Sequence, residues 1–287
     1  MTVSVVGLGL MGRPMAETLA RQGWDVRGWN RSELAQPPEG VVMCDALEQA
    51  ARADVIVLML VDTPTTDAII AQLEPHLGVG QLVIDTGSSN PEHTKEHARR
   101  LAERGVGFVD APVSGGPEGA AAGTLAIMAG GEPMHLTAAA PVLRALGGNV
   151  VTMGGPGAGH TAKVVNQIIV CLTIQAVAEA LALGEACGLD LELVQAALRG
   201  GSADSLILQV QGARMIRRDY APGGRVTTVR KDLSLALELA AAHELVLPHV
   251  ASTVDISEQL IAEGDGALDA SALHKRCAPR LTEEATA

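Results

Sequence analysis

The chain has 287 residues, a formal net charge of −12 and only 1% aromatic residues. This length exceeds that of most single compact domains, so two domains of unequal size are predicted. The acidic charge opposes binding along a phosphate backbone, and the scarcity of aromatic side chains removes the usual platforms for stacked bases, which excludes nucleic acid as a partner.

The cysteines and the apolar segments indicate the compartment. Four cysteines are spread over the chain, at Cys44, Cys171, Cys187 and Cys277. Because they match neither a metal-ligand spacing nor a dense disulfide framework, we predict buried thiols in a reducing cytoplasm and no metal site. The N-terminal MTVSVVGLG lacks the basic segment of a signal peptide, and polar residues interrupt the most apolar stretch, 164–183. A cytoplasmic protein with no membrane partner is the prediction.

A glycine motif follows the expected first strand, 2–6, and precedes an expected helix at 13–22. Its six residues are Gly7, Leu8, Gly9, Leu10, Met11 and Gly12. In this setting the first glycine permits a tight turn, the second lets a pyrophosphate approach the backbone, and the third lets helix and strand pack closely. The phosphates would meet N–H groups at the helix N-terminus. The motif therefore predicts a dinucleotide site.

The end of the next expected strand, 25–29, bears on which dinucleotide binds. An NAD enzyme usually has Asp or Glu there to accept a hydrogen bond from the ribose 2′-OH. This chain has Asn30, Arg31 and Ser32 instead, and a guanidinium with two small polar groups suits a 2′-phosphate. The neighbouring Glu33 adds a negative charge to this segment, which slightly weakens the argument for a 2′-phosphate site. We predict that NADP is preferred, with NAD as the alternative cofactor.

A second glycine-rich segment, DAPVSGG at 110–116, follows the expected strand 107–109. It therefore lies at the carboxyl end of a sheet strand, where open α/β folds bind ligands. Ser114 and the N–H groups of Gly115 and Gly116 would form a cradle for an anion. A substrate carboxylate is the natural occupant, and a turn of purely structural role is the alternative.

Lys163 opens a long apolar segment together with Asn166 and Gln167. The spacing i, i+3, i+4 places the three side chains on one face of a helix. A lysine in this setting can hold a carbonyl oxygen and give it a proton as hydride arrives at the carbon; a surface lysine at a helix entry is the alternative. His160, three residues earlier, is predicted to be a solvated loop residue.

The two halves of the chain differ in pattern. Strand-like runs occur at 3–6, 25–29, 41–43, 55–60, 82–85, 107–109 and 126–129. Their alternation with amphipathic stretches is typical of a parallel sheet covered by helices, whereas Ala/Leu-rich helical patterns run from 159 to about 273. We predict a dinucleotide-binding, α/β Rossmann-type domain over residues 1–161 and an all-helical substrate and oligomerisation domain over residues 162–287, opened by a long interdomain helix. The segment GGPGAG is expected to be a flexible joint, and the tail from 275 is expected to fray.

The order of the motifs resembles that of the β-hydroxyacid dehydrogenases, a family of 3-hydroxyisobutyrate dehydrogenase, tartronate semialdehyde reductase and succinic-glyoxylic semialdehyde reductase type. The resemblance covers nearly the whole chain. It rests on GLGLMGRPMA at 7–16, DAPVSGGPEGAAAGTLAIMAGG at 110–131, GAGHTAKVVNQ at 157–167, KDL at 231–233 and DASAL at 269–273.

The resemblance implies roles for individual positions. Lys163 matches the family's catalytic lysine, and the segment 114–116 with Asn166 matches its substrate site. The resemblance further places four residues beside the cofactor: Leu60, Val61, Ser88 and Lys231. Three positions depart from the family pattern, namely Thr18, where asparagine is frequent, Val61, where proline is common, and Gly87, where serine is frequent. These departures make the substrate harder to assign than the reaction type.

Together these observations predict an NADP-preferring oxidoreductase that interconverts a small carboxylate-bearing aldehyde and its hydroxy acid by hydride transfer, with Lys163 as general acid and base. The alternatives are an NADPH-dependent imine reductase-like enzyme, which Lys163 disfavours, and a non-catalytic dinucleotide-binding sensor, which the set of Ser114, Lys163 and Asn166 disfavours. Helical segments such as 176–186 are apolar almost all round, and the resemblance implies a homodimer or a homotetramer.

Overall fold

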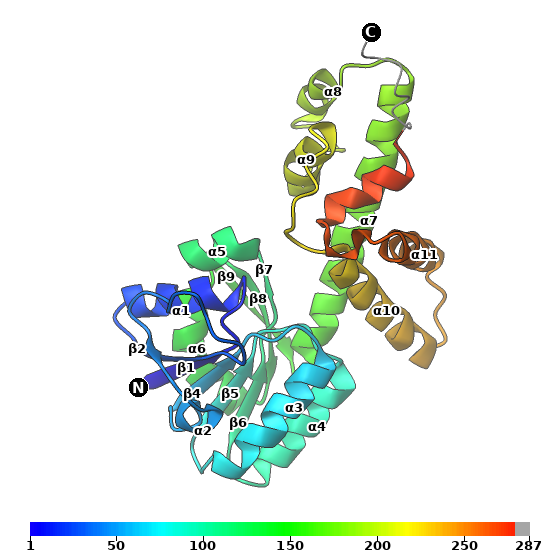
Figure 1. The fold of residues 1–287 in the computed structure, drawn as a ribbon. Helices are drawn as coiled ribbons and strands as arrows, with labels where there is room; N and C mark the ends of the chain where they lie inside the picture. The colour runs from blue at the N-terminus through cyan, green and yellow to red at the C-terminus, as the bar shows by residue number, and fades with distance from the viewer. Residues whose placement is uncertain (279–287) are drawn as a thin grey trace. The chain divides into compact units, whose positions relative to one another are not determined.

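The computed structural model describes residues 1–278 of the chain. The chain divides into two compact units, one from Met1 to Lys163 and a second that begins at Val164 (Figure 1). The sequence predicts this boundary after residue 161.

The first unit contains a nine-stranded sheet and the helices that cover it. Its strands are β1 (Thr2–Val6), β2 (Asp25–Trp29), β3 (Val42–Met43), β4 (Val55–Leu58), β5 (Leu82–Asp85), β6 (Gly107–Asp110), β7 (Val113–Ser114), β8 (Ala126–Gly131) and β9 (Asn149–Gly154). Its α-helices are α1 (Gly12–Arg21), α2 (Leu47–Ala50), α3 (Thr63–Leu73), α4 (Pro91–Ala102), α5 (Gly116–Ala122) and α6 (Pro133–Leu146), and a short 3-10 helix, η1 (Glu74–His76), follows α3.

The strand order is β3-β2-β1-β4-β5-β6-β8-β7, and β9 pairs with β8. The six strands from β3 to β6 run parallel, β8 is antiparallel to β6 and β7, and β9 is parallel to β8. This topology confirms the predicted Rossmann-type fold class. Because the chain leaves β1 in one direction and returns to its other side at β4, the loops after these two strands meet at a switch point, where such sheets bind ligands.

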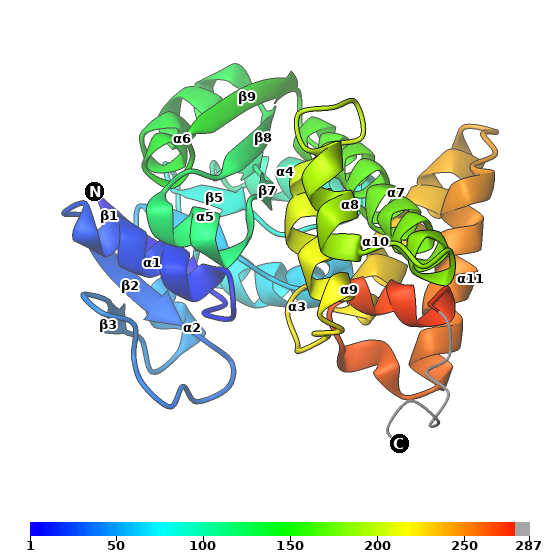
Figure 2. The same ribbon diagram turned by 90° about the horizontal axis from the view of Figure 1, so that it is seen from above.

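Side chains along the buried strands point alternately to the two faces of the sheet, and each face has its own hydrophobic core. Val57 of β4 and Ile84 of β5 face the core beneath α1 and α6, whereas Ile56 and Val83 face the core beneath α3 and α4 (Figure 2). Each central strand is buried on both faces, which explains why these strands appear in the sequence as continuous β-branched runs.

Strands β7 and β9 are absent from the sequence prediction. β7 has only two residues, and five of the six residues of β9 are exposed. An exposed edge strand lacks the run of buried apolar residues that marks the central strands, so its sequence carries little signal.

The second unit is helical. It contains most of α7 (Ala158–Ala186), together with α8 (Leu191–Leu198), the π-helical turn η2 (Leu208–Gly212), α9 (Ala213–Ile216), α10 (Val226–Ala242), α11 (Pro248–Ala262) and the 3-10 helices η3 (Asp265–Ala267) and η4 (Ala270–Arg276). Its core is formed by residues of α7, α10 and α11 with η4, including Ile174, Leu233 and Leu273. The helical second domain is thereby confirmed.

The expectation of a flexible glycine joint before Lys163 is wrong. Helix α7 begins at Ala158, and Gly159 is buried within its first turn. A Cβ on Gly159 would lie 2.3 Å from the carbonyl oxygen of Met128 and 2.5 Å from that of Asp110. Glycine is therefore required here because the helix packs directly against the end of β6 and the middle of β8, and not because the backbone must bend.

Helix α7 is also long and apolar enough to cross a membrane, judged only by its length and composition. Its most apolar 18-residue window has a mean hydropathy of 1.7, and 39% of that window is buried. Cys171, Ala178 and Leu181 of this helix are buried in the core of the helical unit. One face of the helix therefore packs in the core of the helical unit.

Two further expectations need correction. Cys187 is exposed and Cys44 and Cys277 are only partly buried, so the prediction of four buried thiols holds for Cys171 alone; no disulfide joins these cysteines, all of which lie in the described part of the chain. The tail does not fray from Lys275, because η4 continues to residue 276; residues 279–287 lie outside the described residues. No metal-binding cluster of His, Cys, Asp and Glu occurs among residues 1–278.

Candidate active site

The glycine motif lies between β1 and α1, at the carboxyl edge of the sheet. Gly7 has a φ of +95°, and a Cβ on it would lie 2.4 Å from the carbonyl oxygen of Met59. A Cβ on Gly12 would lie 1.8 Å from the carbonyl oxygen of Gly7, so both positions require glycine for packing. Gly9 differs, because a Cβ there would meet nothing within 4 Å. It leaves open space above the backbone, as a phosphate-binding turn requires.

Asn30 holds this loop from the end of β2. Its Oδ1 accepts a hydrogen bond of 2.9 Å from the Leu8 N–H, and its Nδ2 donates one of 2.8 Å to the Ser32 carbonyl oxygen. The side chain of Leu8 is buried in the core, whereas Leu10 is 64% exposed. Asn30 therefore orients both the glycine loop and the turn that follows β2, in addition to its predicted place beside the ribose.

Arg31 and Ser32 are exposed in that turn. The loop beyond them is tied to α1 by Arg13, whose guanidinium donates hydrogen bonds of 3.0 and 3.2 Å to the carbonyl oxygens of Gln36 and Pro37. The turn thus offers a solvent-facing cation at the edge of the sheet where the glycine loop lies. This is the arrangement that a 2′-phosphate site needs.

The loops after β4 and β5 lie at the same edge. Val61 is 71% exposed, whereas Leu60 is buried. Asp85, which ends β5, accepts hydrogen bonds from the Gly87 N–H at 2.9 Å and the Ser89 hydroxyl at 3.1 Å. The loop that carries the half-buried Ser88 is therefore shaped by a buried carboxylate.

The segment after β6 contains the predicted cradle. Ser114 ends β7 and is half-buried, and Gly115 and Gly116 have φ values of +133° and +68°. Two consecutive positive φ angles form a backbone conformation that other residues rarely adopt. The glycines are thus explained by the shape of this turn, which is the kind of concave backbone that binds anions.

Lys163 lies in the second turn of α7 and is 9% exposed. The start of this helix is held by Asp110, whose two carboxylate oxygens accept hydrogen bonds of 2.9 Å from the N–H groups of Gly157 and His160. Burial raises the pKa of the Asp110 carboxyl above its ordinary value, and the nearby His160 and the two backbone N–H groups oppose that rise. The segment that carries Ser114 and the helix that carries Lys163 are therefore joined through one carboxylate.

The prediction of a solvated His160 is wrong. The residue is 1% exposed, and its Nδ1 lies 2.7 Å from the Thr94 hydroxyl oxygen. The error has a simple origin. Once α7 is known to begin at Ala158, His160 lies four residues before the buried Val164 and falls on the buried face of the helix.

The second unit brings together four polar residues on α7 and α10. Asn166 donates a hydrogen bond of 2.8 Å to Gln167, which donates to Asp232, and Asp232 lies 3.0 Å from the Lys231 ammonium. Asp232 is only 4% exposed. The sequence indicates it only as part of the KDL motif, although it shares the buried face of α10 with Val229 and Ala236, a position where a carboxylate is unusual.

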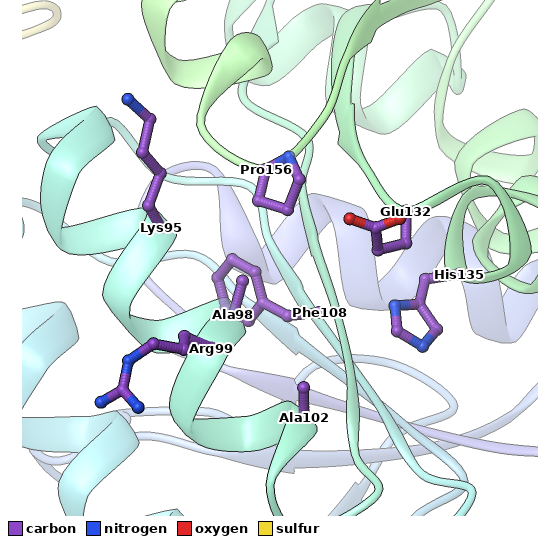
Figure 3. A pocket seen from close by; sticks show the side chains of 8 residues that line it. All are labelled: Lys95, Ala98, Arg99, Ala102, Phe108, Glu132, His135 and Pro156. Carbon is purple, nitrogen blue, oxygen red and sulfur yellow. The ribbon is translucent and has the colours of Figure 1, made fainter.

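A pocket of about 310 Å³ occurs elsewhere in the first unit (Figure 3). Its walls come from α4, the start of α6 and the turn before α7, and its lining residues are Lys95, Ala98, Arg99, Ala102, Phe108, Glu132, His135 and Pro156. None of the predicted site residues lines it. Lys95 and Arg99 are each paired with a glutamate of α4, so the pocket has no uncompensated positive charge from these two residues.

Substituting the glycines singly is expected to separate binding from folding. Gly9→Ala should leave the free energy of unfolding within about 0.5 kcal/mol of the parent, but should weaken NADPH binding about tenfold or more, because the methyl group occupies the space above the loop and obstructs charge-assisted hydrogen bonds. Gly12→Ala should lower the free energy of unfolding by about 1–3 kcal/mol through overpacking. Denaturant unfolding and fluorescence titration with NADPH measure the two effects.

The matched control is Gly224→Ala, another position where a Cβ meets nothing within 4 Å, in the second unit. It should change neither quantity. Parent-like NADPH affinity in Gly9→Ala would show that the space above this residue is not used by the cofactor.

Comparison with known proteins agrees with this geometry. Residues 2–155 match the family model for the NAD binding domain of 6-phosphogluconate dehydrogenase, and residues 157–277 match that for the NAD-binding domain of NADP-dependent 3-hydroxyisobutyrate dehydrogenase. The chain is 40% identical over 284 residues to 2-hydroxy-3-oxopropionate reductase of Escherichia coli K12, which covers 95% of this chain and 96% of that protein. The chain belongs to the β-hydroxyacid dehydrogenase family.

Two other relatives extend the comparison. This β-hydroxyacid dehydrogenase is 32% identical over 276 residues to a probable 3-hydroxyisobutyrate dehydrogenase of Mycobacterium bovis, with 91% of this chain and 93% of that protein covered. Its fold matches the crystal structure of 3-hydroxyisobutyrate dehydrogenase from Salmonella typhimurium with a TM-score of 0.88 at 27% identity, over 96% and 99% of the two chains. The protein is therefore an NAD(P)-dependent oxidoreductase of this family, as its motifs predict.

Proposed function

We propose that this β-hydroxyacid dehydrogenase prefers NADP and interconverts a small carboxylate-bearing aldehyde and its hydroxy acid, with Lys163 as the general acid and base. The observation that carries the proposal is the carboxylate of Asp110. It begins the segment with the predicted carboxylate cradle and also holds the first turn of the helix that presents the buried Lys163. A carboxylate-binding turn and a proton donor are thus built from one connected piece of the first unit.

The residues of the dinucleotide loop fit the cofactor. The open space at Gly9 accommodates a pyrophosphate, and the exposed Arg31 and Ser32 suit a 2′-phosphate. Leu60 and Val61 would line the adenosine side. By the family resemblance, Ser88 would lie near the nicotinamide ribose and Lys231 near the cofactor.

Different residues would bind the substrate carboxylate and transfer the proton. Ser114 and the N–H groups of Gly115 and Gly116 hold the substrate carboxylate. By the family resemblance Asn166 would be a further polar contact, and its neighbour Gln167 is a second candidate. The bound nicotinamide supplies the hydride that reduces the aldehyde carbon. Lys163 donates a hydrogen bond to the aldehyde oxygen and gives it a proton as negative charge develops there, and takes that proton back in the oxidative direction.

The relative in Escherichia coli is named for 2-hydroxy-3-oxopropionate, which is itself a carboxylate-bearing aldehyde, so this compound is the first substrate to test. Initial rates with NADPH and separately with NADH should be measured on it, on succinic, glyoxylic and methylmalonate semialdehydes, and on an uncharged aldehyde of similar size. We expect the acids to be reduced well above the uncharged aldehyde, and faster with NADPH. Equal rates on the uncharged aldehyde would reject the carboxylate cradle, and faster rates with NADH would reject the cofactor preference.

We also infer a soluble, cytoplasmic homo-oligomer. The exposed residues Val165, Ile169, Ala176 and Leu183 follow one another along α7 at helical spacing and form an apolar stripe that a second copy of the chain would cover. Sedimentation velocity distinguishes the expected dimer or tetramer from a monomer, and a monomer at micromolar concentration would contradict the inference.

A further inference from the structure

Three ionisable groups that the proposed reaction does not use are buried close to one another in the first unit. Asp85, Asp110 and His160 are each at most 1% exposed. Burying two carboxylates so close together is unfavourable unless other groups compensate their charge.

Each carboxylate holds the backbone of a segment that carries a proposed site residue. Asp85 fixes the loop around Ser88 through the Gly87 N–H and the Ser89 hydroxyl. Asp110 fixes the first turn of α7 through the N–H groups of Gly157 and His160, and Lys163 lies in the next turn of this helix. Asp110 also precedes, along the chain, the turn of residues 114–116.

The imidazole of His160 lies between the two carboxylates. Its Nε2 is 3.6 Å from Asp85 Oδ2, and its Nδ1 is 3.9 Å from Asp110 Oδ2 and 2.7 Å from Thr94 Oγ1. The Thr94 hydroxyl donates to the carbonyl oxygen of Asn90 at 3.1 Å, which leaves its lone pairs to accept from Nδ1–H. The ring therefore connects the ends of β5 and β6 with α4, and when it is protonated it offsets the repulsion between the carboxylates.

The N-terminal cap of α7 indicates that the start of this helix is held in place relative to β6. A helix is usually capped by the side chain of the residue just before it, but that residue here is Gly157, which has none. The cap comes instead from Asp110, and the glycine at 159 lets the helix approach the backbone of β6 and β8 closely. A remote cap stabilises a helix no better than a local one, but it also fixes where the helix begins relative to β6.

We propose that Asp85, Asp110 and His160 form a positioning triad that holds the Ser88 loop, the 114–116 turn and Lys163 in register with one another. The triad touches neither substrate nor cofactor. This inference rests on the proposed function, because Lys163 and the 114–116 turn must be the groups that act on the substrate. A displacement of about 1 Å between such groups is enough to lower the rate about 100-fold.

The test replaces His160 with glutamine, which retains an amide near Thr94 but cannot carry charge between the carboxylates. Thr94→Val, which removes the partner of Nδ1 and the hydrogen bond to the Asn90 carbonyl oxygen but keeps the imidazole, is the milder second variant should His160→Gln fold poorly. We expect His160→Gln to lower kcat about 10- to 100-fold. This kcat is expressed per NADPH-binding site, and the sites are counted by fluorescence titration. The Kd for NADPH should change less than about twofold. The preference for carboxylate-bearing over uncharged aldehydes should fall as well, because the 114–116 turn and Lys163 no longer align. Thr94→Val should show the same changes to a smaller degree.

The matched control is His97→Gln. His97 is also a buried histidine of the first unit, and it pairs with Asp67 at 2.7 Å, a carboxylate that belongs to none of the three segments. It should lower the melting temperature without changing the turnover per site or the substrate preference. If His160→Gln behaves like His97→Gln, the triad is merely structural and the inference is overturned.

Lys163→Ala distinguishes this inference from the proposed function. If Lys163→Ala keeps turnover, the proposed function fails, and the triad loses the residue that it is inferred to position. If Lys163→Ala is inactive while His160→Gln and Thr94→Val keep parent turnover and substrate preference, the proposed function stands and only the positioning triad is rejected.

Discussion

Replacing Lys163 by alanine is expected to lower kcat for reduction of the best carboxylate-bearing aldehyde by about 10²–10⁴-fold, the usual contribution of a positioned general acid. The Kd for NADPH should stay within about twofold of the parent, because the lysine acts on the aldehyde oxygen and not on the dinucleotide. Steady-state rates with saturating NADPH, together with fluorescence titration of NADPH, measure both quantities.

Lys95→Ala provides the control for charge removal. Lys95 is an exposed lysine of the same unit, paired with Glu92 at 2.7 Å, and its loss should leave kcat unchanged. Lys163→Arg is informative as well, since it keeps the positive charge but holds its proton too tightly to donate it efficiently. Substantial turnover in Lys163→Ala would mean that another group protonates the product.

The second large effect concerns the cofactor. Arg31→Ala is expected to reduce kcat/KM for NADPH about 10- to 100-fold, which corresponds to the loss of about 1.5–3 kcal/mol from hydrogen bonds to a charged group. The value for NADH should change little, because NADH has no 2′-phosphate. The NADPH effect should shrink as salt is raised, since Arg31 lies in an exposed turn.

Arg52→Ala, which removes another exposed arginine of the first unit, controls for the loss of one positive charge. It should affect the two cofactors equally and weakly. A parallel loss with NADPH and NADH in Arg31→Ala would show that this residue supports the loop and does not read the 2′-phosphate.

The glycine motif and the parallel sheet could be predicted from sequence because each depends on local chemistry. Gly7 and Gly12 occupy positions that only glycine fits, and the central strands are buried on both faces, so each leaves a strong local signal. β9 could not be predicted for the opposite reason: five of its six residues are exposed, so it lacks the run of buried apolar residues that marks the central strands.

The candidate site shows the same division. Lys163, Asn166 and Gln167 could be grouped from their helical spacing, whereas the contact between Gln167 and Asp232 joins positions 65 residues apart. His160 was misassigned because its glycine-rich surroundings indicate a loop. Its burial results from Thr94, Asp85 and Asp110, none of which is near it in sequence.

Asn30 has a consequence for the charge that the protein presents to the ribose. The hydrogen bond that fixes the glycine loop uses only its Oδ1, and an aspartate would present an oxygen at the same place. Asn30→Asp would therefore keep the support of the glycine loop and introduce the negative charge that repels a 2′-phosphate and accepts from a ribose hydroxyl, but it would lose the hydrogen bond that Nδ2 donates to the Ser32 carbonyl oxygen. The glycine loop can thus keep its fold while the residue after β2 changes the charge that the protein presents to the ribose.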